Sequence, residues 1–178
     1  TVVYTSAATD AESDALTYAL TGTDAASFSI DATTGQVKLL TPADFETKSS
    51  YSITVNAKDA SNTTTQAVTL NVTDANEAPT KVSLSASSVA ENTSTASALT
   101  IGALTSTDPD SGNTFTYSIV GGADQASFQV SGANLQFVAG TTLDYETKNS
   151  YAVTVRTTDQ GGLTYDKALT VNLTDVNE

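Results

Sequence analysis

Short stretches of alternating apolar and polar residues recur along the chain and predict β-strands. Residues 51–57 (YSITVNA) and 151–155 (YAVTV) alternate with a period of two, which places one face of each strand against a core. Residues 67–72 and 168–173 alternate in the same way. No window shows a sustained helical period of apolar residues, so the pattern predicts an all-β protein.

Two turn-rich segments separate pairs of short apolar runs. Residues 31–35 (DATTG) and residues 131–134 (SGAN) combine glycine with Asp, Ser or Asn, which favour tight turns. Each segment is therefore predicted to join a β-hairpin. About seven short strands in about 100 residues, separated by turns, indicate an antiparallel Greek-key β-sandwich of the immunoglobulin-like type.

The sequence contains two copies of one unit. The segment ADFETKSSYSITV from Ala43 matches LDYETKNSYAVTV from Leu143, 100 residues later. DAASF at 24–28 matches DQASF at 124–128, and DANE at 74–77 matches DVNE at 175–178. Because a repeat of this length is one folded unit, the sequence predicts two tandem sandwich domains, 1–77 and 78–178.

The two copies are unequal in length. The first has no counterpart of residues 78–98, which contain a predicted first strand at 82–86 (VSLSA). A sandwich without an edge strand exposes unpaired main-chain groups and part of its core. We therefore expect either that the chain belongs to a longer array or that another molecule supplies this strand.

Composition excludes several kinds of function. The chain of 178 residues has 7 basic and 20 acidic side chains and a net charge of −13, which excludes nucleic-acid binding through basic patches. It has no Cys and no His, which excludes disulfides, thiolate or imidazole metal sites and catalysis by either group. Its apolar runs are far shorter than the roughly 20 residues of a membrane helix, so no membrane insertion is expected.

Most of the acidic residues gather in short clusters at predicted loops, and the clusters recur in register in both copies. Ca²⁺ takes six to eight oxygen ligands, and carboxylates at alternate positions can turn toward one ion when a loop curls around it. The pair Asp44 and Glu46 could also be interpreted as the acids of a glycosidase, but these need opposed carboxyl groups and one raised pKa. No enzyme is therefore expected. The isolated Asp31 and Asp124 are interpreted as turn formers.

Five motifs in order resemble the cadherin repeat, in the divergent form found in tandem arrays of large bacterial surface proteins. They are VAEN at 89–92, TDPD at 107–110, LDYE at 143–146, VNAKD at 55–59 with VRTTD at 155–159, and DANEAP at 74–79. In that family Ca²⁺ is held at each junction by loops of one repeat, the linker and loops of the next. The resemblance therefore implies Ca²⁺ as the cofactor and neighbouring repeats as partners.

The resemblance also implies which residues bind the ions. The inter-domain set would be Asp44, Glu46, Asp74, Asn76, Glu77, Asp108, Asp110 and Asp159. An N-terminal half-site would contain Asp10, Glu12 and Asp59, and a C-terminal half-site would contain Glu91, Asp144, Glu146, Asp175 and Glu178. Glu77 stands in place of the usual Asp, so the linker geometry is expected to differ from the family pattern. The first copy has no counterpart of Glu91, which predicts weakened or partial occupancy near that copy.

These features predict a calcium-rigidified spacer in an extracellular adhesin or surface fibre of a bacterium. Modules of this kind bind Ca²⁺ at roughly 10⁻⁴ to 10⁻³ M. One alternative is a recognition module that binds a polysaccharide or another surface protein. Another is a fibre subunit completed by strand donation from a neighbouring chain.

Overall fold

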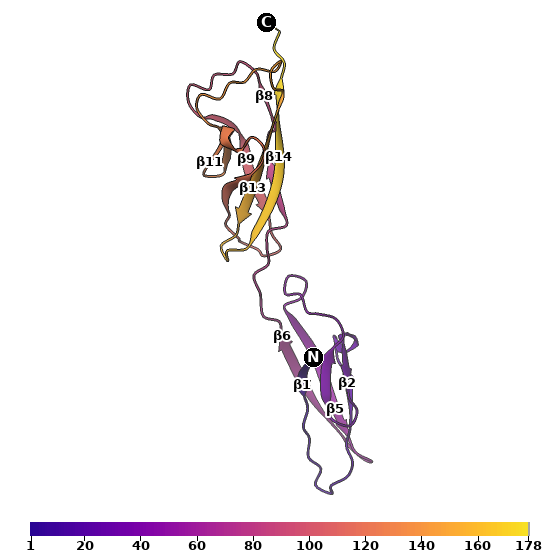
Figure 1. Cartoon of the computed structure of the whole chain (residues 1–178). Helices are drawn as coiled ribbons and strands as arrows, with labels where there is room; N and C mark the ends of the chain where they lie inside the picture. The colour runs from indigo at the N-terminus through magenta and orange to yellow at the C-terminus, as the bar shows by residue number, and fades with distance from the viewer. Residues whose placement is uncertain (178) are drawn as a thin grey trace. The chain divides into compact units, whose positions relative to one another are not determined.

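The computed structural model describes residues 1–177 and consists of strands, loops and two short 3₁₀ turns. It divides into two compact units, Thr1–Ala75 and Asn76–Glu178, which we call unit 1 and unit 2 (Figure 1). The boundary lies two residues before the one predicted from the sequence. Neither 3₁₀ turn is long or apolar enough to cross a membrane.

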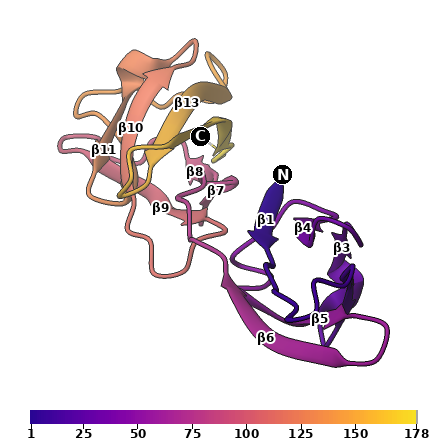
Figure 2. The ribbon, with the colours of Figure 1, turned by 90° about the horizontal axis from the view of Figure 1, so that it is seen from below.

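Unit 1 contains six strands in two sheets. One sheet has the order β1-β4-β3 and the other β2-β5-β6. Figure 2 shows these two layers. The strands are β1 (Val2–Thr5), β2 (Thr17–Thr21), β3 (Phe28–Ile30), β4 (Gln36–Leu39), β5 (Ser50–Lys58) and β6 (Thr63–Asn71), and a 3₁₀ turn covers Ala25–Ser27.

Unit 2 contains eight strands in two sheets of four. Their orders are β11-β12-β9-β7 and β10-β13-β14-β8. The strands are β7 (Lys81–Leu84), β8 (Ser88–Ala90), β9 (Leu99–Thr107), β10 (Thr116–Gly121), β11 (Phe128–Ser131), β12 (Asn134–Phe137), β13 (Ser150–Thr158) and β14 (Thr164–Thr174), and a 3₁₀ turn covers Gln125–Ser127. The fold confirms the predicted all-β sandwich.

The difference between the units is one strand at the edge of each sheet. In unit 2, β7 pairs antiparallel with β9, and β8 pairs parallel with β14, with Val89 opposite Leu173. In unit 1 the corresponding strands, β1 and β6, are the edges of their sheets. The strand predicted at 82–86 is β7, and residues 1–75 contain no segment that corresponds to it.

Each unit has its own apolar core. Val37 and Ile53 are fully buried in unit 1, as are Leu135, Phe137 and Val155 in unit 2. The aromatic residues that recur at matching positions of the two repeats lie in or against these cores. They are Phe28, Tyr18 and Tyr51 in unit 1, and Phe128, Tyr117 and Tyr151 in unit 2.

The predicted hairpin turns are present, and Asp31 forms one of them. Its Oδ1 accepts the N–H groups of Thr33 (2.9 Å) and Thr34 (2.8 Å), and this holds the pKa of Asp31 below its usual value. Gly35 closes the turn with a φ of +65°, and a Cβ there would lie 2.7 Å from the Ser6 carbonyl oxygen. Asp124 differs from this expectation, because its carboxylate bonds to residues far along the chain.

Candidate functional site

Three carboxylates converge at one end of unit 2. Glu91 directly follows β8, Asp175 directly follows β14, and Glu146 lies in the loop before β13. One carboxylate oxygen from each lies within 4.8 Å of the others. The parallel pairing of β8 with β14 brings Glu91 and Asp175 together, because both strands terminate at the same end of the sheet.

Glu91 is the buried member of this group, with 3% of its surface exposed. Its Oε2 accepts the N–H of Tyr145 and its Oε1 accepts the N–H of Val176, both at 2.7 Å. These two amides lower the pKa of Glu91 below its usual value despite the opposing effect of burial. The side chain therefore remains charged at neutral pH and ties two loops together.

Asp144 belongs to the same loop as Glu146 but turns toward its own backbone. Its Oδ1 accepts the Thr147 N–H (2.9 Å) and its Oδ2 accepts the Thr147 hydroxyl (2.7 Å). Asp44 bonds to Thr47 in the same way in unit 1. Hydrogen bonds from the threonine lower the pKa of both aspartates. Both oxygens of each aspartate therefore shape the loop.

A repeated ion pair anchors this loop to the sheet in each unit. In unit 2, Lys148 Nζ lies 2.6 Å from Asp124 Oδ1 and 5.0 Å from the centre of the Tyr151 ring. Asp124 also accepts the N–H of Ala152, and the lysine is the main cause of its lowered pKa. The corresponding pair in unit 1 is Lys48 with Asp24. Both lysines belong to the repeated ETK segment, so the repeat was a possible signal for these pairs. Each aspartate lies 24 residues before its lysine, and the sequence alone does not connect positions so far apart.

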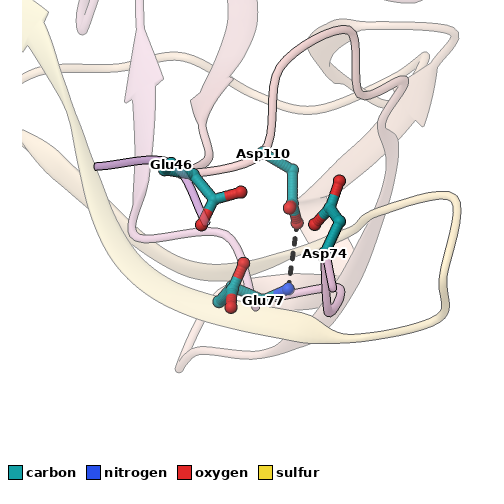
Figure 3. A group of neighbouring side chains, drawn as sticks. All are labelled: Glu46, Asp74, Glu77 and Asp110. Atoms are coloured by element: carbon teal, nitrogen blue, oxygen red, sulfur yellow. Dashed lines mark hydrogen bonds between the residues drawn. The ribbon is translucent and has the colours of Figure 1, made fainter. Parts of the chain in front are cut away.

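A second set of polar side chains gathers where the chain enters unit 2. Asn76 Nδ2 donates to Asp159 Oδ2 (2.9 Å), and the Glu77 N–H donates to Asp110 Oδ2 (2.9 Å; Figure 3). The carboxylates of Glu77 and Asp110 also approach within 4.8 Å. Gly161 makes room for Asn76, because a Cβ at 161 would lie 2.5 Å from the Asn76 side chain. The loops of unit 2 thus hold its first two residues, Asn76 and Glu77, in place.

The loop 108–113 contains buried polar atoms that suit a cation. Asp108 Oδ2 and the side-chain amide of Asn113 are buried and have no hydrogen-bond partner among the described residues. Buried oxygens without a donor are costly in a folded protein. A hard divalent cation would satisfy them by taking them as ligands. Asp108 Oδ1 accepts the N–H of Asp110, which curls the loop. The residues present therefore fit Ca²⁺; the sequence indicated Asp108, but not the Asn113 side chain.

The predicted ligands of unit 1 lie less close together than those of unit 2. Glu46 and Asp74 have carboxylate oxygens within 4.8 Å of one another (both drawn in Figure 3). Asp10 accepts the N–H groups of Glu12 and Asp14, and Asp59 accepts those of Ser61 and Asn62. Within residues 1–177, Asp10, Glu12 and Asp59 do not form a group of converging carboxylates. Glu178 lies outside the described residues.

Comparison with protein families agrees with this arrangement. A family model described as "Cadherin domain" matches residues 1–73 and 85–174. Protein dachsous of Drosophila melanogaster is 33% identical over 92% of this chain, and human Cadherin-23 is 32% identical over 86% of it. The chain spans 5% of each of these proteins. These relatives are animal proteins, so they do not support the bacterial setting suggested by the sequence.

Solved structures show the same fold. Human Protocadherin-24 EC1-2 covers 98% of the chain with a TM-score of 0.77 and 22% identity, and the chain covers 88% of that structure. The Protocadherin gammaB7 EC3-6 cis-dimer structure covers the whole chain with a TM-score of 0.66 and 26% identity. The chain covers 45% of the latter structure.

Proposed function

Because this chain belongs to the cadherin family, we propose that it is a calcium-rigidified spacer of an extracellular adhesive protein or surface fibre. Cadherin repeats are typically calcium-dependent adhesive modules at the cell surface and generally bind Ca²⁺ between domains. The role proposed for this chain is mechanical, and it includes no catalysis. Its first partners are neighbouring repeats of the same kind.

The proposed ligands of an inter-domain site come from three parts of the chain. Unit 1 would contribute Asp44, Glu46 and Asp74, the residues just after the boundary would contribute Asn76 and Glu77, and the loops of unit 2 would contribute Asp108, Asp110 and Asp159. Glu91, Glu146 and Asp175, with Asp144 beside them, would bind Ca²⁺ together with a following repeat. Glu178 completes this second set in the sequence.

The observation that carries the proposal is the pair of polar side chains in loop 108–113. Asp108 Oδ2 and Asn113 Oδ1 are buried without a hydrogen-bond donor among the described residues. Acidic side chains on a surface need no ion to explain them, because water solvates them. Buried oxygens without donors are costly, a divalent cation would satisfy them, and they lie in the loop that the family uses for ligands.

The electrostatic consequence concerns the flexibility of the chain at the boundary. Each close pair of carboxylates repels by about 1 kcal/mol even at the dielectric constant of water. A bound divalent cation attracts every carboxylate that it contacts, and this attraction offsets the repulsion between them. If residues on both sides of the boundary share ions, binding restricts the motion of one unit against the other.

Calcium titration of matched variants tests the proposal. The wild-type chain should bind Ca²⁺ in calorimetry, and Ca²⁺ at 100 times its Kd should stabilise the chain by about 2.7 kcal/mol per site against EGTA. Asp108→Ala with Asp110→Ala should remove binding at the boundary, whereas Asp166→Asn should not, because Asp166 pairs with Arg156. Equal melting temperatures in Ca²⁺ and EGTA for the wild type would refute the proposal.

A further inference from the structure

The loop between β12 and β13 holds Glu146 between two fixed points. On one side of it, the N–H of Tyr145 donates to Glu91 Oε2 at 2.7 Å. On the other side, the ammonium group of Lys148 lies 2.6 Å from Asp124 Oδ1. Glu146 is exposed, yet one of its carboxylate oxygens lies within 4.8 Å of a Glu91 oxygen. The main chain on both sides of Glu146 is therefore held by other parts of unit 2.

The aspartate is the rigid member of this ion pair. Asp124 Oδ2 accepts the N–H of Ala152 at 2.8 Å, and the N–H of Asp124 donates to the Ala152 carbonyl at 3.0 Å. The Asp124 side chain is 16% exposed, whereas that of Lys148 is 43% exposed. Asp124 is thus fixed to β13, and the lysine reaches it from the loop. Through this contact the loop takes its position from the sheet.

The pair also keeps a positive charge away from the carboxylates. Lys148 follows Glu146 by two residues, and its Nζ lies 5.0 Å from the centre of the Tyr151 ring. A lysine without its aspartate is free to turn toward the carboxylates, where its charge would repel a divalent cation. Asp124 balances this charge and holds it beside the Tyr151 ring.

Unit 1 contains the same arrangement. Lys48 Nζ lies 2.5 Å from Asp24 Oδ1 and 5.1 Å from the centre of the Tyr51 ring. Asp24 Oδ2 accepts the N–H of Ser52 at 2.7 Å, as Asp124 does from Ala152. The lysine again follows a proposed calcium ligand, Glu46, by two residues. The ion pair therefore recurs together with the carboxylate that it adjoins.

Another ion pair of unit 2 does not recur. Arg156 Nε lies 2.7 Å from Asp166 Oδ1, and the two residues lie opposite each other on β13 and β14. The corresponding positions of unit 1 are Asn56 and Thr65, which also lie opposite each other. An exposed pair between two strands has thus been exchanged for neutral residues, whereas the pair beside the carboxylate loop is present in both units.

From these contacts we propose that Asp124 and Lys148 are positioning residues for calcium. They hold Glu146 in place and keep the lysine charge away from it, and both effects raise the affinity of this end of unit 2 for Ca²⁺. The matched pair of unit 1 does the same for Glu46. This inference rests on the proposed calcium function, and it assigns a role to two pairs of residues outside the proposed ligand sets.

The test is a calcium titration of the full chain, followed by NMR at the main-chain amides of Glu146 and Asp175. The titration extends beyond the roughly 10⁻³ M at which the weakest modules of this kind bind. Asp124→Asn combined with Lys148→Met removes the pair without changing the net charge. This double variant should raise the Kd about tenfold, the low end of the range for residues that orient metal ligands.

The single variant Asp124→Asn tests the effect of the lysine charge. It leaves the ammonium group of Lys148 without its partner, so the Kd should rise a further two- to fivefold above that of the double variant. A single variant that binds Ca²⁺ as well as the double variant does would overturn this part of the proposal.

The Arg156–Asp166 pair provides the matched control. Arg156→Met combined with Asp166→Asn makes similar chemical changes between two strands of the same unit and should leave the Kd at Glu146 unchanged. Asp24→Asn should raise the Kd at the Glu46 amide but not at Glu146. Thermal melts in EGTA report the stability of each variant separately from its affinity for Ca²⁺.

The outcomes separate this inference from the function on which it rests. If Glu146 and Asp175 respond to Ca²⁺ in the wild type with a Kd that the double variant leaves unchanged, the positioning role is overturned and the calcium function stands. A lower melting temperature without a change in Kd would likewise show that the pair only stabilises the fold. If neither amide responds in the wild type, the calcium function fails at this end of unit 2, and the inference fails with it.

Discussion

The Glu91 side chain accepts a hydrogen bond from the main-chain amide of Tyr145, which lies 54 residues further along the chain. With its second oxygen it accepts the amide of Val176, 85 residues away. One carboxylate thus joins the end of β8, the loop before β13 and the segment after β14. A residue that the family resemblance implied as a metal ligand is therefore also part of the architecture of unit 2.

Glu91→Ala should lower the melting temperature of unit 2 in EGTA, because it leaves two main-chain amides without their acceptor. Glu91→Gln should have a smaller effect, because its amide oxygen can still accept one of them. Unit 1 should melt unchanged, since neither bond involves it. Calorimetry that resolves the two units measures this difference, and a variant that melts like the wild type without calcium would contradict it.

Matched truncations should show that unit 2 has the tighter core. Phe137 is fully buried and stacks on Phe128 at 4.9 Å between ring centres. Phe137→Ala should therefore reduce the free energy of unfolding of unit 2 by about 3–5 kcal/mol. Its counterpart Leu39 is only partly buried against the core of unit 1. Leu39→Ala should cost unit 1 less than about 2 kcal/mol, at or below the low end for buried leucines. Chemical denaturation of each variant provides the comparison, and equal losses would contradict it.

Two glycines with positive φ should differ in their tolerance of alanine. A Cβ at Gly122 (φ +104°) would lie 2.4 Å from the Val153 Cα, whereas a Cβ at Gly112 (φ +78°) would meet no atom within 4 Å. Gly112→Ala should therefore cost only the strain of positive φ, about 1 kcal/mol. Gly122→Ala should cost several times more, because β10 or β13 must move. Denaturation curves for the two variants, measured side by side, test this order.

Unit 2 should lose stability in acid through Asp124. The Lys148 ammonium lowers the pKa of Asp124 below its ordinary value of 3.8. The stabilising effect of this pair is thus complete well above pH 4, and it is lost as the pH falls through the lowered pKa of the folded state. Thermal melts from pH 7 to pH 3 should show a decline that is shallower in Asp124→Asn. Parallel curves for both proteins would show that the pair does not contribute.

Sequence alone determined the all-β fold and the two repeats, because alternation of apolar residues and repeated motifs are local properties. It also indicated Asp31 as a turn former, since both bonds of that side chain reach residues within three positions.

Only the tertiary structure decided which acidic residues act on distant parts of the chain. Asp124 is of a residue type that is common in turns, yet strand pairing brings it to Lys148 and Ala152. Glu91 and Asp175 meet because β8 and β14 run parallel and end together, and Glu146 reaches them from the loop before β13. Asp144, which is in the same motif as Glu146, turns to Thr147. Sequence spacing places such residues on a loop, but the direction of each side chain depends on donors that only the folded sheets bring near.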